Sequence, residues 1–120
     1  MINLWIDIDD SLVLYQNHDN KKHPFGIYMG DPWEPNTRLI NGIKNFAQNN
    51  PNSLIVIWSG GGKDYAQMWK DKLLPDIEAT AMSKNPLAFE LVKSDDIVVD
   101  DAADDIRGIT AKILKPNEWP

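Results

Sequence analysis

The sequence predicts an α/β fold, a doubly wound and mainly parallel sheet, from three observations. Short apolar runs recur along the chain, and segments with apolar residues at helical spacing alternate with them. The 120 residues show no composition break, internal repeat or low-complexity tract, so a single domain is expected over residues 1–120. Strands that are apolar throughout are typical of a sheet covered by helices on both faces.

Each expected element follows from its local pattern. The strands at 54–58 and 97–99 are rich in β-branched residues, and the helices at 37–48 and 63–74 repeat apolar residues every three or four positions. A proline near its start favours a short helix at 86–92. The full expected order is strand 3–8, helix 37–48, strand 54–58, helix 63–74, a weak strand 77–82, helix 86–92, strand 97–99 and a short strand 111–114.

Composition excludes several classes of function. The chain has no Cys, which excludes disulfides, thiolate nucleophiles and zinc–cysteine or iron–sulfur sites. The formal net charge is −6 and the basic residues are scattered, so nucleic acid is expected only as a substrate. The longest apolar run, 54–58, is far shorter than the ~20 residues of a membrane span, so we expect no membrane partner and a cytoplasmic location.

Polar and charged residues follow the expected strands, at the edge where open parallel sheets bind their ligands. Acids follow the first and fourth of these strands, a serine with a glycine run follows the second, and a lysine follows the third. The candidates are Asp7, Asp9 and Asp10, then Ser59, Gly60, Gly61 and Gly62, then Ser83 and Lys84, and finally Asp100 and Asp101.

The chemistry of these residues points to a cation and an anion. Asp7 and Asp9 are separated by one residue, so both side chains are expected on the same side of the chain. Like charges held side by side need a shared cation or proton. Clustered carboxylates suit Mg²⁺, which substrate phosphate can complete, and a glycine run before a helix offers N–H groups to an anion.

Each feature also has a purely structural interpretation that the sequence leaves open. The acids at 7–10 can end a strand, and the glycine run can form a flexible turn. Lys84 can be a solvated surface residue, and the acids between 94 and 105 can form a solvated loop or favour the start of a helix.

Four motifs taken in order carry a family resemblance. They are Asp7-Ile8-Asp9-Asp10-Ser11, then Trp58-Ser59-Gly60, then Lys84-Asn85-Pro86, and finally a strand ending in Asp100-Asp101 with Asp105 four residues on. This order resembles the haloacid dehalogenase (HAD) superfamily of phosphohydrolases, of the small type without a cap domain, over residues 1 to about 105. Two positions depart from the common pattern, since Asp10 stands where Gly is frequent and Ser11 where Thr is usual.

The resemblance implies a mechanism with a covalent intermediate. Asp7 would be the nucleophile that carries an aspartyl phosphate, and Asp9 the general acid and then base. The Ser59 hydroxyl and the Gly60 N–H would hold the phosphoryl oxygens, and Lys84 would balance the charge of nucleophile and phosphate.

The resemblance also implies a Mg²⁺ site. Its ligands would be Asp7, the main-chain oxygen of Asp9 and one acid of the last motif. The spacing to Asp105 favours Asp101, whereas Asp100 is the first acid after the strand, and both are kept as candidates. Ser11, which retains the hydroxyl, is placed with the substrate-binding residues.

The segment 16–36 is expected to form a short flap beside an open site. His18 and His23 lie in it, and Tyr28 and Trp33 either stack on a substrate ring or pack on the body of the protein. The expected substrate is a phosphomonoester such as a nucleotide, a sugar phosphate or a nucleic-acid end. The oligomeric state stays open.

Two other function classes compete with the phosphatase. One is a catalytically silent binding module that keeps the fold and the metal site. The other is a receiver-type signalling domain, which is also an α/β fold with Mg²⁺ and a phosphorylated Asp. The order of the motifs speaks against the receiver, because here the middle strands end in Ser59 and Ser83-Lys84 and the acids return late.

Overall fold

The computed structural model describes residues 2–15, 33–103, 106 and 111–119. Its centre is a five-stranded sheet in the order β5-β4-β1-β6-β7, and all four neighbouring pairs are parallel. The strands are β1 (Leu4–Ile6), β4 (Ile55–Ser59), β5 (Thr80–Ser83), β6 (Ile97–Val99) and β7 (Lys112–Leu114). The predicted α/β fold with a mainly parallel sheet is thus confirmed.

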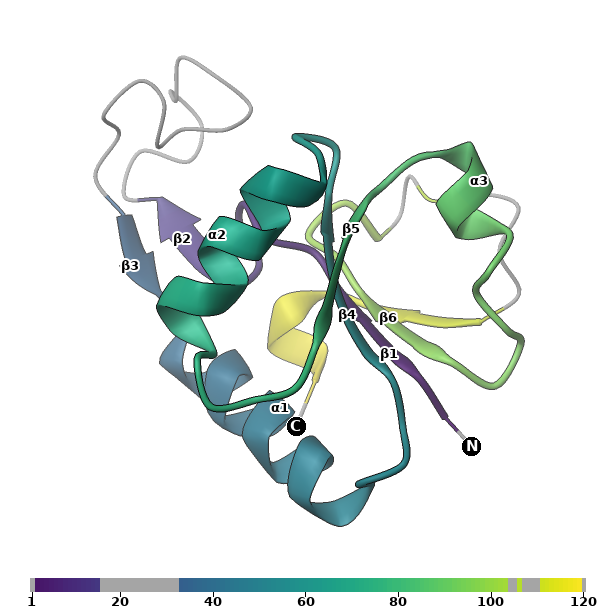
Figure 1. The fold of residues 1–120 in the computed structure, drawn as a ribbon, viewed down its shortest axis with the longest axis horizontal. Helices are drawn as coiled ribbons and strands as arrows, with labels where there is room; N and C mark the ends of the chain where they lie inside the picture. Colours follow the sequence, from purple (N-terminus) through teal and green to yellow (C-terminus); the bar gives the residue numbers. More distant parts are fainter. Residues whose placement is uncertain (1, 16–32, 104–105, 107–110, 120) are drawn as a thin grey trace.

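Helices cover both faces of this sheet (Figure 1). The helices α1 (Thr37–Asn49) and α2 (Lys63–Leu73) lie on one face, and the short α3 (Pro86–Phe89) lies on the other. A 3-10 turn, η4 (Pro116–Glu118), follows β7 near the C-terminus. Within the part of the chain that the structure describes, no helix has the length and apolarity to cross a membrane.

The central strands bury both faces because their side chains alternate between two apolar clusters. Leu4 and Ile6 pack into the cluster under α1 and α2, whereas Trp5 between them packs into the cluster under α3. Trp5 is paired in register with Val56 and Val98, which belong to the same second cluster. Burying one such aliphatic side chain contributes roughly 1.5–3 kcal/mol. The alternation therefore fixes the register of β1 against both neighbours.

The helix termini follow from their local sequences. The Asn36 side chain caps α1 by accepting a hydrogen bond from the backbone N–H of Leu39 at 3.2 Å. Asn85 caps α3 in the same way through Ala88, and Pro86 occupies the first turn, where no N–H is needed.

The structure corrects several predicted bounds. The first strand ends at Ile6 and not at residue 8, and the weak strand lies at Thr80–Ser83 and not at 77–82. The predicted helix at 86–92 ends at Phe89. Ile77 is buried as expected of an apolar residue, but it belongs to the turn between α2 and β5.

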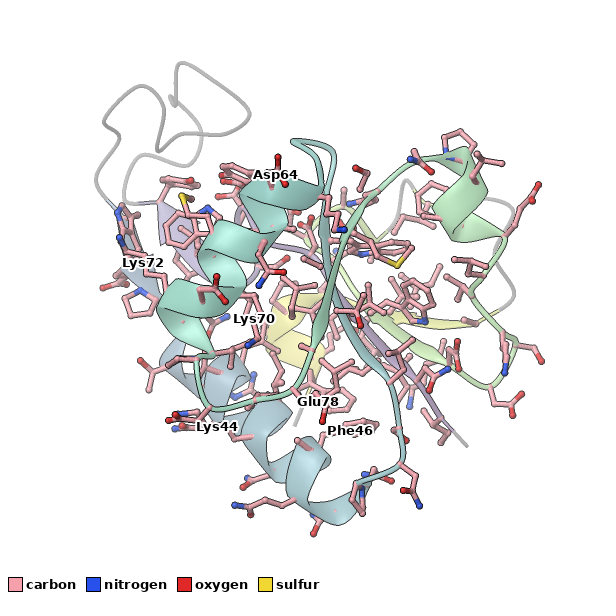
Figure 2. The ribbon with its side chains drawn as sticks, in the orientation of Figure 1. Lys44, Phe46, Asp64, Lys70, Lys72 and Glu78 are labelled. Carbon is pink, nitrogen blue, oxygen red and sulfur yellow. The ribbon has the colours of Figure 1, made fainter. Side chains whose placement is uncertain are left out.

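A small antiparallel ribbon was absent from the prediction. It consists of β2 (Val13–Tyr15) and β3 (Trp33–Pro35), and it lies beside α2 (Figure 1). Trp33 packs edge-on against Trp69 with 4.8 Å between ring centroids, so it packs on the body of the protein. Figure 2 shows Lys72 on the same side of α2, with its ammonium 5.6 Å from the Trp33 ring. The rest of the predicted flap, with His18, His23 and Tyr28, lies outside the described residues.

Three tryptophans are buried in the core. Trp5, Trp58 and Trp69 are each at most 1% exposed. Trp119, near the C-terminus, lies against Phe46 of α1 with 5.9 Å between ring centroids.

The fully buried carboxylate of Asp96 links backbone and side-chain groups at the amino end of the sheet. Asp96 accepts hydrogen bonds from the backbone N–H of Asn3 at 3.0 Å, from the Trp5 indole at 3.0 Å and from the backbone N–H of Lys93 at 2.9 Å. These bonds join the starts of β1 and β6 to the turn that precedes β6.

Replacing Asp96 by Ala would leave three N–H donors without this acceptor. We expect Asp96→Ala to lower the free energy of unfolding by about 3 kcal/mol, measured by urea denaturation. The matched control is Asp95→Ala, because Asp95 is exposed, and it should change the free energy by less than about 0.5 kcal/mol. Equal losses in the two variants would contradict the structural role of Asp96.

Candidate functional site

The carboxyl ends of four neighbouring strands bring the predicted residues together. Asp7 follows β1, and its backbone N–H donates to the carbonyl of Val99 in β6 at 3.0 Å. Ser59 is the last residue of β4, and its carbonyl accepts from the backbone N–H of Lys84 at 2.9 Å. Asp100 follows β6 directly. The parallel sheet thus places side chains from distant parts of the sequence at one edge.

Lys84 links two buried carboxylates. Its ammonium lies 3.3 Å from one oxygen of Asp7 and 2.5 Å from one oxygen of Asp100. The other oxygen of Asp100 accepts from the backbone N–H of Ala102 at 2.9 Å. The Lys84 side chain is 20% exposed, so it reaches these acids from the edge of the site. The interpretation of Lys84 as a solvated surface residue is therefore wrong.

Three acids form a group that can hold a metal ion. Within the residues that the structure describes, Asp7, Asp100 and Asp101 each offer a carboxylate oxygen, and these oxygens all lie within 4.8 Å of one another. Asp7 and Asp100 are buried and Asp101 is exposed. Carboxylate oxygens are the ligands that hard divalent cations prefer, so this donor set fits such an ion. Both candidates from the last motif, Asp100 and Asp101, belong to the group.

The electrostatics of the site follow from this crowding. Burial raises the pKa of Asp7 well above its ordinary value, the nearby charge of Asp100 raises it further, and the Lys84 ammonium lowers it in part. Burial alone would lower the pKa of Lys84, but the charges of Asp7 and Asp100 outweigh burial and raise it. Lys84 therefore stays protonated at neutral pH.

Ser11 is a buried residue that contacts Asp7, the candidate nucleophile. It is fully buried, and its hydroxyl donates to Asp7 at 3.2 Å and accepts from the backbone N–H of Asp101 at 3.1 Å. These bonds connect the loop after β1 to the loop after β6. They give Ser11 a positioning role, and its substrate-binding role stays a prediction.

The loop after β1 turns sharply at Asp10. Asp10 has φ of 63°, a left-handed conformation that Asp adopts more readily than most residues other than Gly. Its backbone N–H donates to the Val13 carbonyl at 2.7 Å, and the carbonyl of Ile8 accepts from both Ser11 and Val13. This conformation accounts for the compatibility of Asp with a position where Gly is frequent in the family that the motifs resemble.

The carboxyl group of Asp9 has different partners from those of Asp7, Asp100 and Asp101. It accepts hydrogen bonds from the hydroxyls of Tyr15 in β2 and Tyr65 in α2. Burial raises the pKa of Tyr65, and its hydrogen bond to Asp9 raises it further, so this phenol stays protonated. Sequence reasoning missed both tyrosines. Tyr65 has only the helical spacing of an apolar residue, and nothing in the sequence marks either hydroxyl as a partner of Asp9.

The glycine run begins the connection from β4 to α2. The Ser59 hydroxyl is buried and accepts from the backbone N–H of Gly61 at 3.0 Å, while Gly60 is exposed. Gly62 has φ of 106°, which favours glycine, and it is the residue before α2. Figure 2 shows Asp64 at this end of α2, where an acid interacts favourably with the helix dipole.

The geometry can be set beside known proteins. Comparison of the chain with protein-family models, with curated proteins and with solved structures finds no match.

Because ionised Asp7 is disfavoured in the metal-free fold, removing its charge should stabilise that state. With a chelator present and near neutral pH, we expect Asp7→Asn to raise the melting temperature by on the order of a few degrees. The folded pKa of Asp7 is raised, so wild-type stability falls as pH rises through it, and the variant lacks this loss.

The gain in melting temperature should accordingly shrink toward about pH 4, where the unfolded carboxyl also binds its proton. Calorimetry of both proteins across this pH range measures it. A gain that is larger in acid than at neutral pH would contradict the raised pKa of Asp7.

Proposed function

We propose that this protein is a Mg²⁺-dependent phosphohydrolase of the HAD type that hydrolyses phosphomonoesters. The observation that carries the proposal is the contact of one lysine, Lys84, with two buried acids, Asp7 and Asp100, at the carboxyl edge of a parallel sheet. Like charges buried together cost free energy, and such groups of perturbed acids are frequent at functional sites. The order of the four motifs along the chain supports the same conclusion.

The acids Asp7, Asp100 and Asp101 are the residues that would hold Mg²⁺, together with the main-chain oxygen of Asp9. The bound ion would offset the negative charge of the carboxylates and of the phosphoryl group. Both acids of the last motif are assigned to this site, because both lie in the same group of oxygens.

The chemistry proceeds in two steps on Asp7. In the first step a carboxylate oxygen of Asp7 attacks phosphorus, the bond from phosphorus to the ester oxygen breaks, and Asp9 gives its proton to the departing oxygen. In the second step water attacks the phosphorus of the aspartyl phosphate and gives a proton to Asp9. The bond from phosphorus to Asp7 then breaks, which releases phosphate and restores both residues.

The remaining residues bind and orient the phosphoryl group. The Lys84 ammonium contacts the nucleophile already and balances the charge that the phosphoryl group brings. The Ser59 hydroxyl and the Gly60 N–H are assigned to the phosphoryl oxygens. Ser11 holds Asp7 through its hydroxyl, which keeps the attacking carboxylate in one orientation.

The substrates that this proposal includes are nucleotides, sugar phosphates and nucleic-acid ends. The net charge of −6 makes a cation necessary to bring any of these anions to the acids of the site. Activity should therefore be lost on chelation and restored by Mg²⁺.

The experiment measures phosphate release from p-nitrophenyl phosphate and from a panel of nucleotides and sugar phosphates, with Mg²⁺ and with a chelator. We expect Asp7→Asn to lower turnover at least about a thousandfold, because the nucleophile is lost. Asp76→Asn is the matched control, since it makes the same chemical change at an exposed acid near the opposite end of β5. This control should keep wild-type turnover.

Metal-dependent release that survives in Asp7→Asn would refute the nucleophile assignment. A wild-type protein that is silent on the whole panel, yet binds Mg²⁺ in calorimetry, would favour the catalytically silent binding module over the phosphatase.

A further inference from the structure

Two phenol hydroxyls from different elements hold the carboxyl group of Asp9. The Tyr15 hydroxyl lies 2.6 Å from Oδ1 of Asp9. The Tyr65 hydroxyl lies 2.8 Å from the same oxygen and 2.9 Å from Oδ2. A carboxylate oxygen can accept two hydrogen bonds and each phenol donates one, so both tyrosines can donate to Oδ1 at the same time.

Both tyrosines are themselves fixed by the core. Tyr15 and Tyr65 are 6% and 4% exposed and belong to the apolar cluster under α1 and α2. The Tyr65 ring also meets Trp69 edge-on, with 6.5 Å between centroids. Because neither ring can follow a rotating carboxyl group, rotation of Asp9 about its Cβ–Cγ bond would break both hydrogen bonds.

The two tyrosines also give Asp9 different surroundings from those of Asp7, the other acid of the first motif. Asp7 contacts Lys84 and Ser11 and belongs to the group of metal-ligating oxygens. Asp9 accepts hydrogen bonds from the hydroxyls of Tyr15 and Tyr65, and among the described residues its carboxylate is not part of that group. Two acids one residue apart are thereby given different surroundings, which is what a division into nucleophile and proton carrier requires.

We propose that Tyr15 and Tyr65 are positioning residues that hold the Asp9 carboxyl group in the orientation in which it transfers a proton. This inference rests on the proposed phosphohydrolase function. The proton that moves belongs to Asp9, which gives it to the leaving oxygen and regains one from water. Each tyrosine donates its hydroxyl hydrogen to Oδ1, which leaves Oδ2 as the oxygen that carries the transferred proton.

The dependence of rate on the leaving group distinguishes this role from a merely structural one. A leaving oxygen that is stable as an anion needs little protonation, whereas a basic one needs the acid. The constant kcat/KM reports only the steps up to departure of the leaving group. A misplaced Asp9 should therefore lower kcat/KM most for the most basic leaving groups.

The experiment compares wild type, Tyr15→Phe, Tyr65→Phe and Asp9→Asn on substituted phenyl phosphates, from p-nitrophenyl to p-methoxyphenyl phosphate. The Phe variants keep the ring and remove only the hydroxyl. We expect each to lower kcat/KM about tenfold or more on p-methoxyphenyl phosphate and less than about threefold on p-nitrophenyl phosphate. Asp9→Asn should show the same trend more steeply.

Phe46→Leu is the control for lost stability, since Phe46 is a core residue of α1 packed on Trp119. It should lower the melting temperature without any dependence on the leaving group. In the double variant Asp9→Asn/Tyr65→Phe, the second change should have no further effect on kcat/KM, because Tyr65 acts through Asp9.

The outcomes separate the two hypotheses. A steep trend in Asp9→Asn with equal losses across the series in both Phe variants would overturn the positioning role and leave the phosphatase standing. The same follows if the losses of Asp9→Asn and Tyr65→Phe add in the double variant. A wild-type protein inactive on these aryl phosphates and on the nucleotides and sugar phosphates of the panel would refute the proposed function and this inference with it.

Discussion

The burial of like charges at the carboxyl edge of the sheet is the constraint on which this site depends. Asp7 and Asp100 are both buried, and one ammonium, that of Lys84, contacts both. Burial raises the pKa of Asp7, and the nearby charge of Asp100 raises it further, so a single ammonium lowers the pKa only in part. The central strands β1, β4 and β6 bury apolar side chains on both faces of the sheet, and this burial offsets the cost of burying the acids.

Hydrogen bonds between neighbouring loops hold the charged residues of the site in place. The loops after β1 and β6 are joined through the Ser11 hydroxyl, which contacts Asp7 and the backbone of Asp101. The loop after β5 is joined to β4 through the backbone of Lys84 and Ser59. Each charged side chain therefore leaves a loop that is fixed to its neighbour, so the positions of the charges are set before any ligand arrives.

The sequence was sufficient for the parts of the fold that rest on continuous apolar patterns. The strand predicted at 54–58 is observed at Ile55–Ser59, and the helix at 37–48 is observed at Thr37–Asn49. Because parallel strands end at one edge, the acids, the serine and the lysine could be placed together from their order alone. The ribbon of β2 and β3 could not be predicted, since it pairs two three-residue segments across a long connection. The tyrosines on Asp9 were missed for a different reason, because a hydroxyl on an apolar face has no periodic signature.

The two ends of β6 show most clearly what sequence cannot supply. Asp96 precedes the strand and Asp100 follows it, both are at most 1% exposed, and in the sequence both belong to one acidic stretch. Asp96 accepts three N–H groups, one of them from the Trp5 indole, and these donors satisfy the carboxylate without any cation. Asp100 is instead paired with a lysine beside a second buried acid. Both residues are aspartates, so their roles depend on the groups that the fold places around them. Asp96 stabilises the sheet through its N–H donors, whereas Asp100 is placed where it can bind an ion.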